Sequence, residues 1–450
     1  MHTYLAIDIG ASSGRHIVAW REQGEMVLKE VYRFPNLPKT EGGHLIWDVN
    51  ALYREVINGL KACKEAGYEP DSVGIDTWAV DYVLLDEADK AILPMYCYRD
   101  KRGAEAVESV HDKISFEELY ERTGIQFQPF NTIYQLQADR QAGRLEKASD
   151  FLMLPEYLSF LLSGKKCHEY TNASSTGLLD AAKKTWDMEI IKRLDFPAHL
   201  FESKPELPPV ALGNLRPEIA EAIGFQCEVV LPCTHDTGSA VAALPKELCV
   251  PGSQMAFLSS GTWSLLGAEL PAPVTTKEAK AANFTNEGGV GTIRFLKNIM
   301  GLWMVQCLKR EWKEEFSFAE LADMAREEGS FDYHLDVNAG RYLAPESVCN
   351  EIETECREKG YPVPQTAGQF AHAIYQSLAH AYAEAITELE TITGQHYDAL
   401  CIVGGGVNNT YLNELTERAI KRPVLTGSSE ATALGNILLQ EIQKRSKLKE

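Results

Sequence analysis

The chain has 450 residues, 45% of them hydrophobic and 24% charged, and its formal net charge is −20. This length predicts two domains, because a single hydrophobic core stops growing beyond about 250–300 residues. The negative charge argues against a nucleic-acid or anionic-membrane partner, since little basic surface is left to neutralise phosphates. The ten cysteines include no C-x-x-C pair, which gives no sign of a zinc site or disulfide framework and favours a reducing cytoplasm.

No targeting segment or membrane span is expected. The first residues, MHTYLAIDIG, lack the basic start of a signal peptide, and Asp8 interrupts their apolar run. The uncharged stretch 248–268 is long enough to cross a bilayer, but its proline, glycines and serines exclude a membrane helix.

The first informative segment is a predicted strand over residues 3–9, followed by a turn and a second strand; the turn is Gly10, Ala11, Ser12, Ser13, Gly14 and Arg15. Its free backbone N–H groups, two hydroxyls and one guanidinium are suited to bind a phosphate. Asp8 lies just before the turn, and a carboxylate beside a phosphate favours Mg²⁺ held partly through water. An ordinary hairpin tip is the alternative.

The next elements follow ordinary patterns. A strand is predicted over 26–34, a helix over 48–66, and amphipathic helices within a segment that decorates the first domain, at 116–123, 131–142 and 155–163. The buried run 72–85 is interrupted by Asp76, Trp78 and Asp81, which are typical of a pocket for a polyhydroxylated ligand. A core tryptophan with surface aspartates is the alternative.

The stretch 228–244, EVVLPCTHDTGSAVAAL, combines a buried strand, a polar turn and a helix of small residues expected to begin at Ser239. Asp236 lies between strand and helix, where the first N–H groups of the helix favour an ionised carboxylate. Such a group is suited to accept a proton from a hydroxyl. Asp236 or Thr237 acting as a simple helix cap is equally compatible with this stretch alone.

The second half repeats the opening design. The stretch 255–268 again reads as a strand, a Ser/Gly turn and a strand, which suggests an internal duplication, and Thr262 offers the best hydroxyl in this second turn. Residues 286–306 are predicted to include an amphipathic helix with Asn298 and Gln306 on roughly the same face, although solvated amides are the plainer interpretation.

The C-terminal part reads as α/β. A long core helix is expected over 368–393, followed by a buried strand that ends in Gly404, Gly405 and Gly406. Without side chains, such a strand end lets a flat ring or a phosphate approach the backbone. A helix, a strand and a last helix from Glu430 to Lys444 are expected to close the second domain.

Taken together, these segments resemble the FGGY carbohydrate kinases almost from end to end. The motifs that carry the resemblance are DIGASSGR, GIDTWAVDYVLLD, THDTGSAV, SSGTWSLLG, TNEGG, LKNIMGLWMVQ, IVGGGVNN and EATALGN. The family implies an α/β fold of two actin-, hexokinase- and Hsp70-like (ribonuclease H-like) domains with an interdomain cleft. It implies a sugar-binding domain over 1–245, which carries the phosphate hairpin, and a nucleotide-binding domain over 246–450.

The resemblance also implies the site. ATP would bind to Ala11, Ser12, Ser13, Gly14, Arg15, Thr262, Gln306 and Gly405, with Mg²⁺ near Asp8. The sugar would bind to Ala79, His235, Asp236, Thr237 and Asn298, with Asp236 as proton acceptor. Relatives carry Gly where Ala79 stands; a backbone contact survives this change, but the sugar pocket becomes slightly tighter.

The implied reaction is ATP-dependent phosphorylation of L-rhamnulose at its 1-hydroxyl in the cytoplasm. The nearest alternative is another sugar of the family, such as L-fuculose, xylulose or a polyol. A more distant one is an ATP-gated clamp or filament subunit of the Hsp70 or actin kind, which would need neither base nor sugar pocket. Oligomeric state is not predicted.

Overall fold

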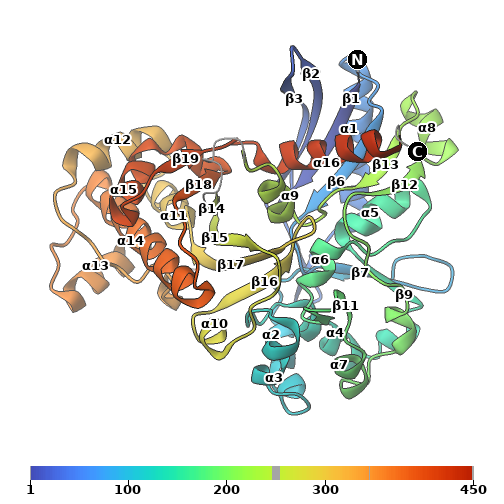
Figure 1. The fold of residues 1–450 in the computed structure, drawn as a ribbon, viewed down its shortest axis with the longest axis horizontal. Coiled ribbons are helices and arrows are strands. Elements are labelled where there is room, and N and C mark those ends of the chain that lie inside the picture. The colour runs from blue at the N-terminus through green and yellow to red at the C-terminus, as the bar shows by residue number, and fades with distance from the viewer. Residues whose placement is uncertain (1, 246–253, 344, 448–450) are drawn as a thin grey trace.

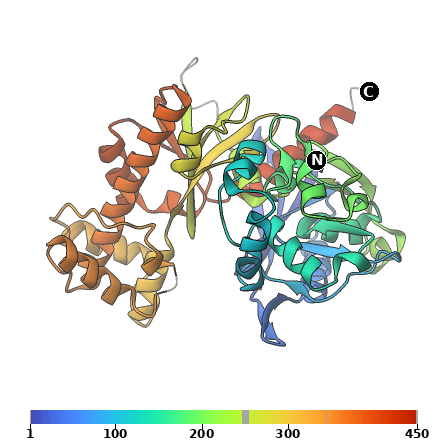
Figure 2. The ribbon, with the colours of Figure 1, turned by 90° about the horizontal axis from the view of Figure 1, so that it is seen from below.

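The computed structural model describes residues 2–245, 254–343 and 345–447, and each of its two lobes is built around a six-stranded sheet (Figures 1 and 2). The first sheet has the order β12-β13-β6-β1-β2-β3, with β1 Thr3–Ile9, β2 Ser13–Glu22, β3 Glu25–Pro35, β6 Ser72–Thr77, β12 Val210–Asn214 and β13 Glu228–Leu231. The second has the order β16-β17-β15-β14-β18-β19, with β14 Met255–Ser260, β15 Trp263–Leu270, β16 Phe284–Gly288, β17 Ile293–Met300, β18 Ala399–Val403 and β19 Val424–Thr426.

The two sheets repeat one topology around their hairpins. Strands β1 and β14 each pair antiparallel with the strand that directly follows, β2 or β15. Each also pairs in parallel with a much later strand, β6 or β18, which in turn pairs in parallel with β13 or β19. This equivalence of the two strand–turn–strand units is the duplication that the sequence predicted.

The predicted helices are present. Asp48 caps the first, where its carboxylate accepts a hydrogen bond of 2.8 Å from the N–H of Ala51. The predicted helices are α1 Val49–Glu65, α3 Phe116–Thr123, α4 Thr132–Gln141, α5 Leu154–Ser163 and α14 Ala367–Thr393. The helix predicted after the three glycines is α15 Thr410–Ile420. Further helices are α2 Arg102–His111, α6 Tyr170–Ser174, α7 Met188–Arg193, α8 Pro217–Ile223, α10 Lys277–Ala281, α11 Trp303–Glu311, α12 Phe318–Glu328 and α13 Val348–Lys359.

The middle of the chain forms an additional layer of helices and short strands on the first sheet, as predicted (Figure 1). This layer has its own apolar core. It also contacts the second lobe. The hydroxyl of Tyr120 donates to the carbonyl of Phe284 (2.7 Å), and the N–H of Gly288 donates to Ser174 Oγ (2.7 Å), so the layer holds β16 against the first lobe. The small strands of the first lobe are β4 Lys39–Glu41, β5 His44–Trp47, β7 Tyr82–Leu85, β8 Met95–Tyr96, β9 Asp150–Met153, β10 Leu179–Asp180 and β11 Thr185–Trp186.

Two helices, α16 and α9, lie where the two lobes meet (Figure 1). The last helix, α16 (Ala431–Lys447), was expected to close the second domain, but it packs on the first sheet (Figure 1). Gln440 donates to the carbonyl of Leu5 (3.0 Å), and Asn436 donates to the carbonyl of Gly74 (3.1 Å). Helix α16 also packs against α9 (Asp236–Ala242), so α16 ties the end of the chain to the lobe in which it starts.

The predicted helix carrying Asn298 and Gln306 on one face is wrong. Asn298 lies in β17, whereas Gln306 lies in α11, and the chain changes direction between them after Met300. A second difference concerns α9, which begins at Asp236 and not at Ser239. In both places the residue spacing fitted a helix, but the spacing alone did not fix where the helix begins.

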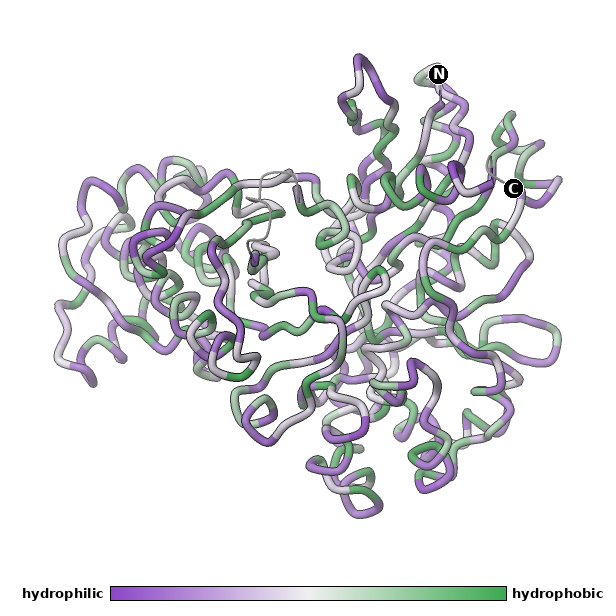
Figure 3. Tube along the Cα trace, in the orientation of Figure 1, coloured by the Kyte–Doolittle hydropathy of each residue, from purple (hydrophilic) through white to green (hydrophobic). Residues whose placement is uncertain are grey.

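The expected domain boundary between residues 245 and 246 stays a proposal. Residues 246–253, the first eight of the proposed second domain, lie outside the described residues. Within the described part of the chain, no helix is long and apolar enough to cross a membrane. Figure 3 agrees, since hydrophobic and hydrophilic residues alternate along the whole described chain. The described end of the uncharged stretch forms β14 and part of β15.

Candidate active site

Carboxylates gather where the central strands of the first sheet end. Asp8 of β1 lies opposite Asp76 of β6 in a parallel register. The N–H of Thr77 donates to the carbonyl of Thr234, just after β13 (2.9 Å). Because parallel strands bring their carboxyl ends to one edge, Asp8, Asp76 and the turn before Asp236 meet there. Burial, and then the charge of Asp8, raise the pKa of Asp76 well above its usual range.

Asp236 is the first residue of α9, and its side chain remains 32% exposed. Its Oδ1 accepts from the backbone N–H (2.5 Å) and the hydroxyl (3.1 Å) of Thr237. Neither residue caps the helix, since His235 is the cap and makes no capping side-chain bond. Burial raises the pKa of Asp236, while the neighbouring His235 lowers it. A carboxylate with a raised pKa is a stronger base than an exposed one.

His235 connects Asp236 to a buried ion pair of the second lobe. Arg294 of β17 approaches His235 Nδ1 with its Nη2 (3.1 Å) and Glu287 Oε2 of β16 with the same atom (3.2 Å). His235 Nδ1 also lies 3.3 Å from Glu287 Oε2, and Nε2 on the other side of the ring faces Asp236 Oδ1 at 3.4 Å. This contact orients His235 across the two lobes.

Glu287 and Arg294 are directly opposite in the β16–β17 ladder, and both are buried. Burial opposes the charge of Glu287, but the attraction of Arg294 and His235 holds the pKa of Glu287 below its usual value. The sequence analysis gave these two residues no role. A signal was present at Arg294, however, because it places a full charge among apolar residues of its strand.

Replacing Glu287 with Gln is expected to lower the free energy of unfolding by about 3–5 kcal/mol, because Arg294 would stay buried without a counter-charge. The measurement is urea denaturation of both proteins at pH 7. Glu358→Gln is the matched control, since Glu358 pairs with the partly exposed Arg341 (3.0 Å) and such pairs contribute about 0–1 kcal/mol. Equal effects of the two substitutions would contradict this account of the ion pair.

Glu169 is a second residue that the sequence analysis missed. Its buried carboxylate accepts hydrogen bonds from the N–H (3.0 Å) and the hydroxyl (2.6 Å) of Thr234, and from the N–H of Thr171 (2.8 Å). Thr234 is two residues before Asp236. Glu169 therefore fixes the turn that presents Asp236, from a position 67 residues earlier in the chain.

Of the five residues assigned to ATP in the first lobe, Ala11 and Ser12 lie in the hairpin turn, whereas Ser13, Gly14 and Arg15 are the first residues of β2. The turn is closed by a hydrogen bond from the N–H of Gly10 to the carbonyl of Ser13 (2.9 Å). Arg15 reaches Asp8 Oδ2 (2.8 Å) and Glu430 Oε2 (2.7 Å), so its guanidinium lies between the two lobes.

The residues assigned to ATP in the second lobe also lie together. Gln306 Nε2 donates to Thr262 Oγ1 (3.3 Å) from the start of α11. Gly406 packs so closely on β14 that an added Cβ would lie 2.0 Å from Ser260 Oγ. A Cβ at Gly405 would meet no atom within 4 Å, so this residue leaves its backbone open to a ligand.

The residues assigned to the sugar are spread over separate elements. Ala79 is half-buried beside Val80, whose φ of +71° is unusual for a branched side chain. Asp81 accepts from the indole N–H groups of Trp47 (2.7 Å) and Trp78 (2.9 Å), and all three are buried. The core alternative is therefore correct for Trp78. For Asp81, neither the sugar-binding alternative nor the surface alternative is correct, because its carboxylate is buried inside the lobe.

Asn298 lies on β17, four residues after Arg294 and on the same face of the strand. This spacing separates the two by about 13 Å. The structure therefore places Asn298 on the face of β17 that carries the contact to His235, without bringing it to Asp236.

Comparisons with known proteins agree with this geometry. The model of the N-terminal domain of the FGGY family of carbohydrate kinases matches residues 3–243, and that of the C-terminal domain matches residues 256–443. A rhamnulokinase of Oceanobacillus iheyensis is 46% identical over 440 residues, which cover 97% of this chain and 92% of that protein. A rhamnulokinase of Bacillus subtilis is 42% identical, over 98% of this chain and 90% of that protein.

Solved structures show the same fold. A xylulose kinase from Rhodospirillum rubrum has a TM-score of 0.79 at 16% identity and covers 98% of this chain and 90% of its own. Plasmodium falciparum glycerol kinase with ADP has a TM-score of 0.78 at 16% identity and covers 98% of this chain and 89% of its own. The predicted fold class, two α/β domains of the actin and hexokinase kind, is thereby confirmed.

Proposed function

Because this chain belongs to the FGGY family of carbohydrate kinases, we propose that its sugar substrate is L-rhamnulose, which it phosphorylates at the 1-hydroxyl with ATP. The observation that carries the choice of sugar is the set of relatives named rhamnulokinase, which are 40–46% identical over nearly the full chain. The chain is a phosphotransferase. The cytoplasm is the proposed location, and the free cysteines of the described residues suit its reducing conditions.

We assign sugar binding to residues 1–245 and nucleotide binding chiefly to residues 246–450. In this proposal the sugar contacts Ala79, His235, Asp236, Thr237 and, from the second lobe, Asn298. The triphosphate is held between the two hairpin turns by Ala11, Ser12, Ser13, Gly14, Arg15 and Thr262, with Gln306 and Gly405 holding the rest of the nucleotide. The repeated hairpin topology supports this division, since equivalent turns from two lobes can bind the two ends of a polyphosphate.

The carboxylates at the strand ends fit a Mg²⁺ ion. Asp76 Oδ1 is buried without a hydrogen-bond partner, and Asp76 faces Asp8 across the ladder. Oxygen ligands of this kind are those that Mg²⁺ prefers, so Asp8, in part through water, and Asp76 would hold it. When bound, the ion neutralises charge on the phosphates.

The chain's own groups carry the proton transfer. Asp236 takes the proton of the sugar hydroxyl as the oxygen attacks the γ-phosphorus, and its raised pKa favours that transfer. His235, held between Arg294 and Glu287, faces Asp236 with its Nε2 and orients the carboxylate. The backbone N–H groups of both turns meet the charge that develops on the transferred group. Positioning of the sugar in line with the phosphate supplies most of the acceleration.

A sugar panel tests the proposed substrate. With MgATP and a coupled assay of ADP release, we expect kcat/KM for L-rhamnulose to exceed that for L-fuculose, xylulose and glycerol by at least about 10-fold, the discrimination that one methyl-sized pocket supplies. A higher kcat/KM for another sugar would change the proposed substrate but not the family to which the chain belongs. ATP turnover that does not depend on any sugar would favour the alternative of an ATP-gated clamp.

A further inference from the structure

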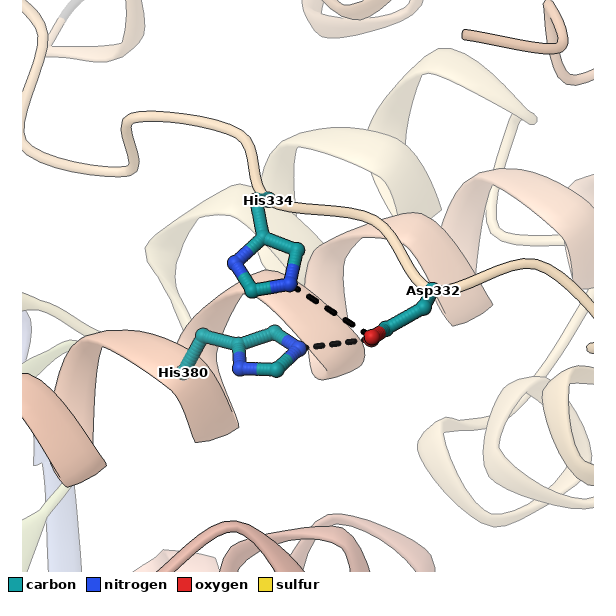
Figure 4. Close-up of side chains that lie close together, drawn as sticks. All are labelled: Asp332, His334 and His380. Atoms are coloured by element: carbon teal, nitrogen blue, oxygen red, sulfur yellow. Dashed lines mark hydrogen bonds and ion pairs between the residues drawn. The ribbon is translucent and has the colours of Figure 1, made fainter.

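Two histidines and an aspartate converge on the surface of the second lobe (Figure 4). Asp332 and His334 lie on the segment after α12, and His380 lies on α14. His380 Nε2 is 2.6 Å from Asp332 Oδ1, and His334 Nε2 is 3.5 Å from Asp332 Oδ2. One nitrogen of each ring and one carboxylate oxygen therefore lie within 4.8 Å of one another.

This cluster has no part in the proposed reaction. The cluster lies on the segment between α12 and α13 and on α14, all in the second lobe, whereas α9 lies beside the first sheet (Figure 1). The side chains are accessible, with 65% of Asp332, 47% of His334 and 22% of His380 exposed. An ion can therefore reach them directly from solvent.

The segment that carries Asp332 and His334 is fixed to α14 on both sides of the cluster. Before it, His372 Nε2 binds the carbonyl of Phe331 (2.7 Å). After it, the N–H of Leu335 donates to Ser377 Oγ (3.0 Å). His372, Ser377 and His380 all come from α14, so the backbone that presents the three ligands is ordered before any ion binds. Binding then loses little conformational entropy.

Gln376 adds a contact from the turn of α14 just before His380. Its Nε2 lies 2.5 Å from Asp332 Oδ1, and this bond orients the carboxylate toward His380. Side chains such as Gln376, which hydrogen-bond to a ligand residue but do not bind the ion, are typical of metal sites because they hold the ligand atoms in place.

The two imidazoles and one carboxylate match the ligands of Zn²⁺ and similar ions in sites that keep a position open for water. At bond lengths of about 2.0–2.1 Å, tetrahedral ligand atoms are about 3.3–3.4 Å apart. The distance from His334 to Asp332 Oδ2, 3.5 Å, is close to this value, whereas the distance from His380 to Asp332 Oδ1, 2.6 Å, must widen. The carboxylate binds the ion with both oxygens or turns to present one of them.

The rings must also rotate. Their centroids are 3.5 Å apart and their planes differ by 21°, so they are stacked and their Nε2 lone pairs are nearly parallel. An ion needs the rings to splay until both lone pairs meet at one point. His334 is the ring that can move, since it is nearly half exposed and lies on a connecting segment. To bind the ion each Nε2 must offer a lone pair, so any proton on these atoms is released.

We propose that Asp332, His334 and His380 form a binding site for one divalent transition-metal ion of the Zn²⁺ type, completed by water. The ion ties the segment after α12 to α14. Mg²⁺ is excluded from this site by its preference for oxygen ligands and octahedral geometry. The site is thus separate in both place and ion type from the one proposed at Asp8.

Isothermal titration of the untagged protein, after removal of metals with EDTA, tests the site with Zn²⁺ at pH 7.5. We expect one Zn²⁺ per chain, no heat with Mg²⁺, and at least about 10-fold weaker binding for His334→Ala and for His380→Ala. His396→Ala is the matched control, because His396 also contacts a carboxylate, Glu390 (2.7 Å), but has no second histidine beside it. It should bind Zn²⁺ like the unmodified protein.

Co²⁺ supplies a second readout that reports geometry. Its visible absorption should show a bound ion in the unmodified protein and in His396→Ala, and should be lost in His380→Ala. Kinase activity with MgATP should be the same in all of these proteins, which also shows that the variants are folded. Zn²⁺ binding that is absent from the unmodified protein, or that survives loss of His380 unchanged, would overturn the proposal.

Discussion

The Asp236→Asn variant is expected to lose about 10²- to 10⁴-fold in kcat, the range that a general base contributes. Asparagine has nearly the same shape, and its carbonyl oxygen can still accept from the N–H and hydroxyl of Thr237. What it lacks is the capacity to take the hydroxyl proton of the sugar. The loss should therefore appear in kcat, while the KM for ATP stays nearly constant, because no ATP contact is assigned to Asp236.

The stability of the Asp236→Asn variant distinguishes a role of Asp236 in proton transfer from a structural role. Burial raises the pKa of Asp236 in the folded state, so the folded protein binds its proton more tightly than the unfolded chain does. The contribution of this carboxyl to stability therefore falls as pH rises through that raised pKa. At pH 7 the Asn variant should unfold at the same or a higher urea concentration than the unmodified protein. A less stable variant with full activity would contradict both the proton transfer and this sign.

The pH dependence of the unmodified enzyme provides a further check on the same residue. The ionised carboxylate is the active form, so kcat/KM for the sugar should rise with pH through the pKa of Asp236 and then level off. Because burial raises that pKa, the rise should lie above the usual range of an aspartate. Asp112→Asn, at an exposed position, is the matched control and should leave the profile unchanged.

The parts of the proposed site whose backbone structure the sequence predicted correctly are local ones. The hairpin at Gly10 to Arg15 and its counterpart at Thr262 follow from apolar strands interrupted by small polar residues, a pattern complete within about 20 residues. The glycines at 404–406 are equally local. In each case the backbone conformation is decided by neighbours in the chain, so short-range chemistry was sufficient.

The missed parts depend on contacts between distant segments. Glu169 acts on Thr234, and the pair Glu287 and Arg294 acts on His235, so their role is visible only when the lobes are in place. Asn298 was misplaced for a related reason. Its eight-residue spacing from Gln306 fits one helical face, but pairing of β17 with both β15 and β16 forms a strand instead. Tertiary pairing overrides local periodicity here.

The position of α16 shows the same limit. Its apolar pattern predicted a helix, but nothing in that pattern said which sheet would receive it. The answer lies in small and amide side chains, since Asn436 and Gln440 bond to the first sheet and Gly435 lets the helix approach α9. The end of the second lobe's chain thus supports the helix on which Asp236 lies.

Gly435→Ala is expected to disturb both stability and catalysis through this crossing. A Cβ at position 435 would lie 1.8 Å from the carbonyl oxygen of Ser239 and 2.7 Å from its carbonyl carbon, both backbone atoms of α9. Neither atom can move without displacing the helix. The two helices must therefore separate, and Asp236, three residues before Ser239, must move with α9. Overpacking of this kind costs about 1–3 kcal/mol or more of stability.

Whether Gly435→Ala raises or lowers the free energy of unfolding decides the test. Where nothing is in the way, replacing a helical glycine with alanine stabilises a protein by about 0.5–1 kcal/mol, so a loss can come only from the crossing. Gly340→Ala is the matched control, because a Cβ there meets no atom within 4 Å. We expect Gly435→Ala to unfold at lower urea and to lose kcat/KM for the sugar, whereas Gly340→Ala should keep its kcat/KM and unfold at the same or a higher urea concentration. If Gly435→Ala matched its control, α16 could not be the support that holds α9 and its aspartate in place.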